Sequence, residues 1–345
     1  MTRAALTAPR AVAPATSWTG GQPDRRRLIA VLAGTQTIGY GVLYYAFAVL
    51  LTPIAADLGA PTAAVTGALT ISILVAAAAA VPVGRWLDRH GGRLLMTAGS
   101  MLGAAAVAGW SQVHELWQLY AVFALVGLGG AMSLYEAAFA VIVAVTEPAR
   151  RTQALLAVTI VAGFASSIFF PLTGWLLRLG DWRTAVLALA VLLAVTAVPG
   201  HVIAIPGRAR FQALRNRQSG AGVRAALLDR TFWLYAVAFV IHAAAVATVG
   251  VLLVAYLQYR GHPAAVAATV AGLLGVLSVA GRLIASALAR RHGMVAITAA
   301  VFAVQALGAA ALPALSESVG GAAVCVTAFG LGFGVATIAR PAMPQ

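Results

Sequence analysis

The chain alternates long apolar runs with short polar breaks in which arginines gather. Each run is close to the roughly 20 helical residues that cross a bilayer core about 30 Å thick. None shows the period-two alternation of a barrel strand, and lipid offers no partner to an open backbone, so transmembrane α-helices are expected. The ten predicted spans are 28–52, 64–86, 94–112, 117–145, 153–177, 183–205, 231–257, 264–289, 294–315 and 320–339.

Composition excludes a water-soluble fold. Hydrophobic residues make up 61% of the chain and charged residues 9%, whereas a soluble domain has roughly a quarter of its residues charged. The formal net charge of +14 does not indicate a nucleic-acid partner, because no basic stretch is interleaved with base-stacking aromatics in a polar domain. The single cysteine, Cys325, excludes an internal disulfide and a cysteine-based metal site. The expected class is an all-α polytopic helical membrane protein without a metal or cofactor.

The arginines predict which side each loop faces, because cationic loops are retained in the cytoplasm. With the N-terminus inside, nearly all arginines fall in the N-terminal tail and the inside loops, and only Arg178, Arg183 and Arg260 fall in outside loops. We therefore expect a multi-pass protein of the cell (plasma) membrane, with both the N- and C-termini cytoplasmic.

Polar stretches divide the chain into four parts. Residues 1–27 are rich in Ala, Pro and Thr and are expected to form a disordered cytoplasmic tail. Residues 28–205 would form an N-terminal bundle of six helices, and 206–230, the longest polar interruption, a cytoplasmic loop between bundles. Residues 231–345 would then form an incomplete C-terminal bundle of four helices.

A short repeat relates the two halves. Arg89-His90-Gly91 closes the loop between the second and third spans, and Arg291-His292-Gly293 closes the loop between the eighth and ninth. Because both stand at the same place of their half, the sequence indicates a parallel duplication of six helices.

The loop after the second span carries a family resemblance. Gly84-x-x-x-Asp88-Arg89-x-Gly91-x-Arg93 resembles the cytoplasmic loop signature of the major facilitator superfamily. The resemblance implies twelve helices in two bundles that rock around a central cavity.

The first span narrows the resemblance. Gly39-Tyr40-Gly41 and Tyr44-Tyr45-Ala46-Phe47 resemble the branch that contains the monocarboxylate and oxalate–formate carriers. Two departures limit what carries over. Ala124 stands where proton antiporters of the superfamily have an arginine, so typical drug/proton exchange is not expected. The chain also stops soon after Arg340-Pro341, where relatives continue into an eleventh and a twelfth helix, so a C-terminally truncated carrier is expected.

Two charged residues are predicted to lie within the bilayer, where a charge costs about 2.5 to 3.5 kcal/mol on insertion scales. Glu136 lies eleven residues before Glu147, roughly 16 Å deep, and Arg282 lies eight residues before Arg290, about 12 Å deep. Either could be paired and serve only helix packing. For Arg282, whose long side chain could reach the interface, both interpretations stay open. For Glu136 a functional role is favoured, because a short acid reaches water only if a cavity comes to it.

Three further features could serve a transport pathway. Gln36, Tyr40 and Tyr44 share one face of the first span, which spacing alone makes either an interhelical seam or a cavity wall. In the resemblance the first helix lines the cavity, which favours the wall. His242 could bind substrate or relay a proton, or could instead be satisfied by a backbone carbonyl. Pro171 with Gly174 is expected to bend the fifth span.

The leading hypothesis is a secondary active carrier of a small solute, specifically an organic anion, working by alternating access with protons as the coupling ion. Its partners would be the lipid bilayer, the small-molecule substrate and protons. Glu136 and Arg282 would act across the cavity, because a guanidinium fork suits a carboxylate and a desolvated glutamate can take up a proton. Two alternatives remain: a non-transporting product of an interrupted carrier gene, and a membrane-embedded enzyme, which the absence of hydrolase, zincin and nucleotide-binding motifs argues against.

Overall fold

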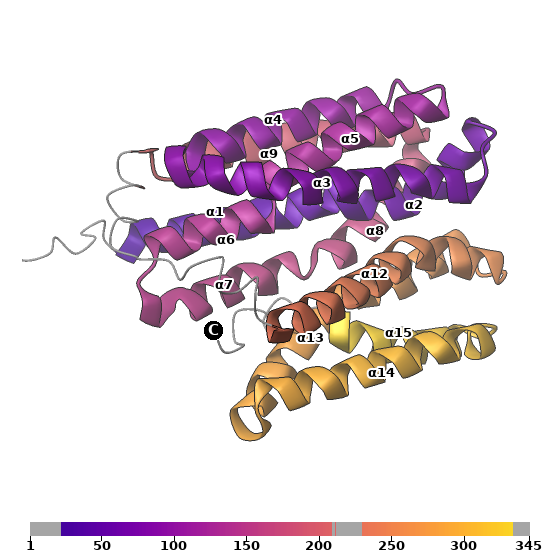
Figure 1. The fold of residues 1–345 in the computed structure, drawn as a ribbon. Coiled ribbons are helices and arrows are strands. Elements are labelled where there is room, and N and C mark those ends of the chain that lie inside the picture. Colours follow the sequence, from indigo (N-terminus) through magenta and orange to yellow (C-terminus); the bar gives the residue numbers. More distant parts are fainter. Residues whose placement is uncertain (1–21, 209–210, 212–229, 334–345) are drawn as a thin grey trace, which may run out of the picture.

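The computed structural model describes residues 22–208, 211 and 230–333, and this part of the chain is helical without strands (Figure 1). The helices are α1 (Gln22–Tyr40), the π-helix η1 (Gly41–Tyr45), α2 (Ala46–Asp57), α3 (Thr62–His90), α4 (Gly92–Trp110), α5 (Leu116–Ser133), α6 (Tyr135–Val145), α7 (Pro148–Ala162), α8 (Ala165–Leu179), α9 (Trp182–Ala204), α12 (Arg230–Tyr259), α13 (Ala264–His292), α14 (Met294–Leu315) and α15 (Val319–Phe333).

Over the described residues, all ten predicted spans coincide with helices, and the last six residues of the tenth span, 334–339, lie outside them. Eight helical stretches in the described residues are long and apolar enough to cross a membrane. The other two are α4, whose Arg93 and glycines lower its hydropathy, and α15, an apolar helix described over 15 residues. The all-α membrane architecture predicted from the hydrophobic pattern is therefore confirmed.

The helices run side by side as two groups, with α1 to α9 forming one and α12 to α15 the other (Figure 1). The first group has an aromatic core, in which Phe47 meets Phe123 edge-on at 5.1 Å between ring centroids and Phe123 meets Trp110 at 4.8 Å. Glycines let α4 approach α5 closely, since a Cβ added at Gly99 would lie 2.5 Å from Met132 Cβ.

The two groups meet through α2 on α12 and α8 on α13. At the first contact Thr52 Oγ1 donates to Gln258 Oε1 at 3.2 Å. At the second, Ser167 Oγ donates to the Gly272 carbonyl at 2.6 Å and accepts from the Val276 amide at 3.1 Å. Ser167 of α8 is thus inserted into the backbone hydrogen bonding of α13.

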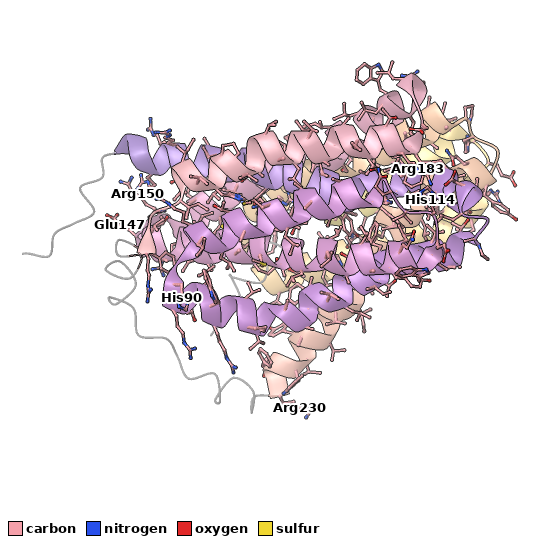
Figure 2. The ribbon with its side chains drawn as sticks, turned by 90° about the horizontal axis from the view of Figure 1, so that it is seen from above. His90, His114, Glu147, Arg150, Arg183 and Arg230 are labelled. Carbon is pink, nitrogen blue, oxygen red and sulfur yellow. The ribbon has the colours of Figure 1, made fainter. Side chains whose placement is uncertain are left out.

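Polar residues mark the two ends of the bundle. Figure 2 places His90, Glu147 and Arg150 at one end, and His114 and Arg183 at the other. The first set belongs to predicted inside loops and the second to predicted outside loops, so the helices alternate in the order that the span assignment requires.

The corresponding loops of the two halves have the same local geometry. Gly91 ends α3 with φ 85° and Gly293 precedes α14, after the end of α13, with φ 78°. Positive φ is strained for residues with a Cβ, so glycine is required at both places. This agreement supports the duplication inferred from the Arg-His-Gly repeat.

Helix boundaries differ from the prediction at the edges of the first half. Helix α1 begins at Gln22, six residues before the predicted first span, which is compatible with Pro23 because the first turn of a helix tolerates proline. Residues 1–21 of the predicted tail, most of the loop 206–230 and residues 334–345 lie outside the described residues. Phe211, within that loop, is buried against Gly91.

Two predicted spans are interrupted within the membrane. The fourth breaks at Leu134, between α5 and α6, where the backbone is extended (φ −86°, ψ −158°). The fifth breaks at Gly163 and Phe164, between α7 and α8. Helix α8 runs through Pro171 and Gly174 without a break, so the bend expected there stays a prediction. The interruption of the span lies instead where α13 packs against Gly163.

Candidate functional site

A cavity of about 480 Å³ lies between the first span, α3, α5 and α6. Its polar lining comes from Tyr40, Tyr44, Ser72 and Glu136, and the rest of the lining is aliphatic or glycine. The cavity extends along α3 as far as Leu87 and so reaches toward the end of the bundle that carries the loop signature. Cavities of this size hold small molecules.

The break at Leu134 places Glu136 in the first turn of α6, exposed to this cavity. A helix N-terminus carries a partial positive charge and unpaired amide groups, which stabilise a carboxylate. No hydrogen bond or ion pair to Glu136 occurs within the described part of the chain. The carboxylate is therefore open to a ligand or a proton.

Aromatic rings surround the acid. Tyr40 and Tyr135 lie 4.5 Å apart between ring centroids, and Tyr135 stacks on Phe139 at 4.8 Å. On the next turn Tyr44 meets Tyr45 edge-on at 5.2 Å. Of these rings, Tyr40 and Tyr44 line the cavity.

Arg282 occupies the second break. Its side chain is 4% exposed, and Nη1 donates to the Thr159 carbonyl at 2.5 Å, in the last turn of α7. A Cβ added at Gly163 would come within 2.3 Å of Nη1, so only glycine leaves room for the guanidinium. A cation at a helix C-terminus is stabilised by the partial negative charge there. Each intramembrane charge therefore sits at a helix end of complementary sign, and each of these ends exists because a span is broken.

The structure brings only some of the predicted site residues together. Glu136, Tyr40 and Tyr44 line one cavity, whereas Arg282 is not among its lining residues. Tyr40 and Tyr135 are near enough to interact electrostatically with both charged groups. The tyrosine pair is thus the common neighbour of Glu136 and Arg282.

Gln36 belongs to a seam. It is fully buried, and Nε2 donates to the Ser133 carbonyl at 2.8 Å, which satisfies one of the carbonyls left open where α5 ends. Spacing placed Gln36, Tyr40 and Tyr44 on one face, and the structure divides that face into a seam and a cavity wall.

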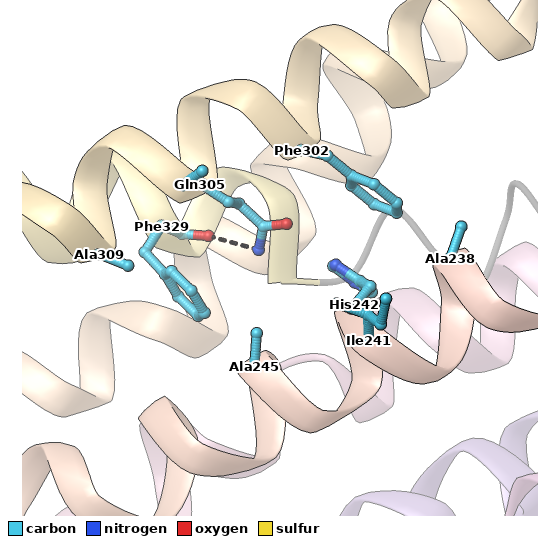
Figure 3. A pocket seen from close by; sticks show the side chains of 9 residues that line it. Ala238, Ile241, His242, Ala245, Phe302, Gln305, Ala309 and Phe329 are labelled. Carbon is cyan, nitrogen blue, oxygen red and sulfur yellow. Dashed lines mark hydrogen bonds between the residues drawn. The ribbon is translucent and has the colours of Figure 1, made fainter.

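His242 lines a separate cavity of about 360 Å³ between α12, α14 and α15 (Figure 3). Its imidazole stacks on Phe302 at 4.2 Å between ring centroids, with 11° between the planes. Gln305 reaches over the same cavity and donates from Nε2 to the Phe329 carbonyl at 3.0 Å. This cavity shares no lining residue with the one at Glu136.

The loop signature residues lie at one end of α3 and the start of α4. Gly84 lines the first cavity, Gly91 provides the positive φ, and Arg93 Nε donates to the Ile205 carbonyl at 2.6 Å, at the end of α9. Asp88 and Arg89 stand in the last turn of α3 between them.

Sequence reasoning missed His201 of α9. Its Nε2 lies 3.0 Å from Thr35 Oγ1 of α1, and its Nδ1 lies 2.8 Å from Ser100 Oγ of α4. The three side chains are buried and tie three helices of the first group together. The available signal was a histidine near the end of an apolar span, which does not reveal its partners. No cluster of three metal-ligating side chains occurs among the described residues.

Two groups of membrane-spanning helices are related by a repeated loop, and the first group contains a cavity with a single acid; together these features define the class of a polytopic membrane carrier fold. The family model of the Major Facilitator Superfamily matches residues 29–345. The chain belongs to this superfamily.

Solved carriers share the fold. A bacterial homolog of the human lysosomal transporter Spinster, inward-facing and unoccupied, is 16% identical with a TM-score of 0.70, covering 92% of this chain and 75% of its own. The D-xylose–proton symporter is 14% identical with a TM-score of 0.60, and the match covers 91% of this chain and 81% of the symporter. The nucleoside transporter NupG is 14% identical with a TM-score of 0.67, and the match covers 92% of this chain and 81% of NupG. At these identities the likeness concerns the fold alone. No curated protein sequence matches the chain.

Proposed function

We propose that the protein is a secondary active carrier of a small organic solute, working by alternating access and coupled to protons at Glu136. The observation that carries the proposal is a cavity of about 480 Å³ in which one carboxylate stands among aromatic and aliphatic walls. Binding at such a site can be exchanged between the two membrane faces when the helix groups move relative to one another.

The similar solved structures support carriage without naming a solute. Their titles describe a lysosomal-type transporter homolog, a sugar–proton symporter and a nucleoside transporter. Because fold does not specify cargo, the choice among substrate classes depends on the residues of this cavity.

Proton coupling is assigned to Glu136 because it is the titratable acid in the cavity lining. Protonation removes its charge and the stabilisation by the N-terminus of α6, so the affinity for a solute in contact with it changes with its protonation state. Tyr40 and Tyr44 complete the contact surface.

The hypothesis of an anionic substrate rests on Arg282, and it stays a prediction. Arg282 is 4% exposed and lies outside the cavity lining, so its guanidinium reaches a substrate anion only after a conformational change. A carrier that uses Arg282 for an anion would therefore bind it in a conformation in which this side chain has become accessible from the cavity.

Proteoliposomes containing a pH-sensitive dye test the carrier proposal. A set of organic acids, amines, sugars and nucleosides is added outside, and one class is expected to change the internal pH. Glu136→Gln should abolish this solute-driven proton flux while solute-for-solute exchange persists. Glu317→Gln, which neutralises an acid exposed in the turn before α15, is the matched control and should behave as the unaltered protein. No flux and no exchange with any class would contradict the proposal.

We also propose that the carrier resides in the plasma membrane with the Glu147 end of the bundle in the cytoplasm. The support is the concentration of arginines in the loops predicted to lie at that end.

A further inference from the structure

The lining of the cavity at Glu136 carries negative charge and no positive charge. Of the described residues that line it, Glu136 alone carries a formal charge. Arg282 lies outside the lining, bound to the Thr159 carbonyl. We infer that this cavity binds an amphipathic organic cation, with the Glu136 carboxylate as its counter-ion; the inference rests on the proposed carrier function and names its substrate class.

The walls fit the apolar part of such a cation. On one side α3 contributes Ile73, Ala76, Ala77 and Ala80, a strip of short aliphatic side chains. A strip of this kind is flat and offers no hydrogen bond, so it favours ring or alkyl groups over sugars and other polyols. The cavity volume of about 480 Å³ accommodates a molecule with several rings or a branched alkyl body.

The aromatic residues fit the charged part. Tyr40 and Tyr44 line the cavity together with Glu136. Cations are attracted to the faces of aromatic rings, and the attraction strengthens when water is excluded. A carboxylate flanked by rings therefore selects a large, weakly hydrated cation over a small, strongly hydrated one.

An anion is disfavoured at the same place. Its charge would face the Glu136 carboxylate in a cavity with few polar groups, where like charges repel more strongly than in water. Burying an anion there requires Glu136 to be protonated and leaves the anion without a partner in the lining.

A proton and an organic cation compete for this carboxylate. The titratable groups around it are Tyr40 of α1, Tyr44 of η1 and Tyr135 of α6, and Arg282 of α13 interacts with two of these tyrosines. Neither α3 nor α5 contributes a titratable side chain to the lining. Affinity for the cation should therefore fall as pH is lowered, because the protonated acid has no charge to offer. Competition of this kind would exchange a proton for the organic cation at Glu136. This exchange does not require the arginine that typical proton antiporters carry in the fourth helix.

The test is a binding measurement with a charge-inverted pair of probes. Tetraphenylphosphonium and tetraphenylborate have nearly the same size and shape and opposite charge. Each is equilibrated with the purified protein in lipid nanodiscs, and binding to empty nanodiscs is subtracted. We expect saturable binding of tetraphenylphosphonium that weakens as the pH is lowered and weakens at least about tenfold in Glu136→Gln. Glu317→Gln, with the same change of charge on an exposed turn, should bind as the unaltered protein does.

Several outcomes overturn the assignment. Equal binding of the two probes would overturn the cation assignment. Phosphonium binding that does not change with pH would also overturn it. Both results are measured on the unaltered protein, so neither depends on a variant that folds. Benzoate binding that is lost in Arg282→Lys would replace the cation with an anion and leave the carrier proposal standing. Failure of all transport in proteoliposomes would count against the carrier proposal, whichever probe the protein binds.

Discussion

At the scale of single residues, the two intramembrane charges are stabilised by the ends of broken helices. Glu136 stands at the N-terminus of α6 and Arg282 at the C-terminus of α7, so each charge meets a helix end of opposite partial charge. Their depth could be predicted by counting residues. Their neighbours could not, because an extended Leu134 and a break at Gly163 leave the hydrophobic pattern of both spans unchanged.

The substitution Gly163→Ala tests the packing of the Arg282 guanidinium against Gly163. The added Cβ would lie 2.3 Å from Nη1 and 2.7 Å from Val279 Cγ2, so the guanidinium has to leave the Thr159 carbonyl or α13 has to shift. We expect a loss of stability of about 1 to 3 kcal/mol, as overpacking of a close contact usually costs. Thermal unfolding in detergent measures it. Gly174→Ala is the matched control, because nothing lies within 4 Å of a Cβ there. Equal melting temperatures for the two variants would contradict the contact.

Asp181 offers a pH-dependent contribution outside the membrane spans. It precedes α9, and its carboxylate accepts the Thr184 amide at 2.7 Å, which lowers the pKa of Asp181 below its usual range. A depressed pKa gives stability that is present above the unfolded pKa and lost as pH falls through the folded value. Asp181→Ala should therefore lower the melting temperature near neutral pH and do so less in acid. A deficit that is constant down to about pH 3 would contradict the cap.

At the scale of elements, the contact of α2 with α12 should open during transport, because alternating access requires the helix groups to separate in turn. Thr52 and Gln258 are hydrogen-bonded across it. In a Cys325→Ala background, Thr52→Cys with Gln258→Cys is expected to form a disulfide on oxidation and to stop transport until it is reduced. Each single cysteine variant, oxidised in the same way, is the control. A crosslinked protein that still transports at the full rate would show that this contact does not need to open.

The helices could be predicted from the hydrophobic pattern of the sequence, whereas the breaks within them could not. Over the described residues, each of the ten apolar runs coincides with one or more helices, because the length and hydropathy of a run decide whether it can span a bilayer. The breaks were not predictable, because each depends on a distant partner: Gln36 contacts the carbonyl of Ser133, and Arg282 that of Thr159. The fifth span carries a local signal for a bend at Pro171, but its interruption lies elsewhere, where α13 packs against Gly163. The acid of the cavity could be found from the sequence, whereas its separation from Arg282 could not.

For the whole molecule, the arrangement of loops predicts which surface faces the cytoplasm. Glu147 and His114 are exposed and lie at opposite ends of the bundle in Figure 2, and the only native cysteine, Cys325, is buried. In a Cys325→Ala background, Glu147→Cys and His114→Cys therefore report one end each. The arginine-rich loops lie at the Glu147 end, and positively charged loops stay in the cytoplasm. We expect a membrane-impermeant maleimide to label His114→Cys in intact cells and Glu147→Cys only after permeabilisation. The reverse pattern would invert the orientation of every span at once. Labelling of both in intact cells would instead require an even number of crossings between two loops that the structure separates by one span, made of α5 and α6. Only the first of these two results leaves the fold intact, so the experiment separates an error of orientation from an error of topology.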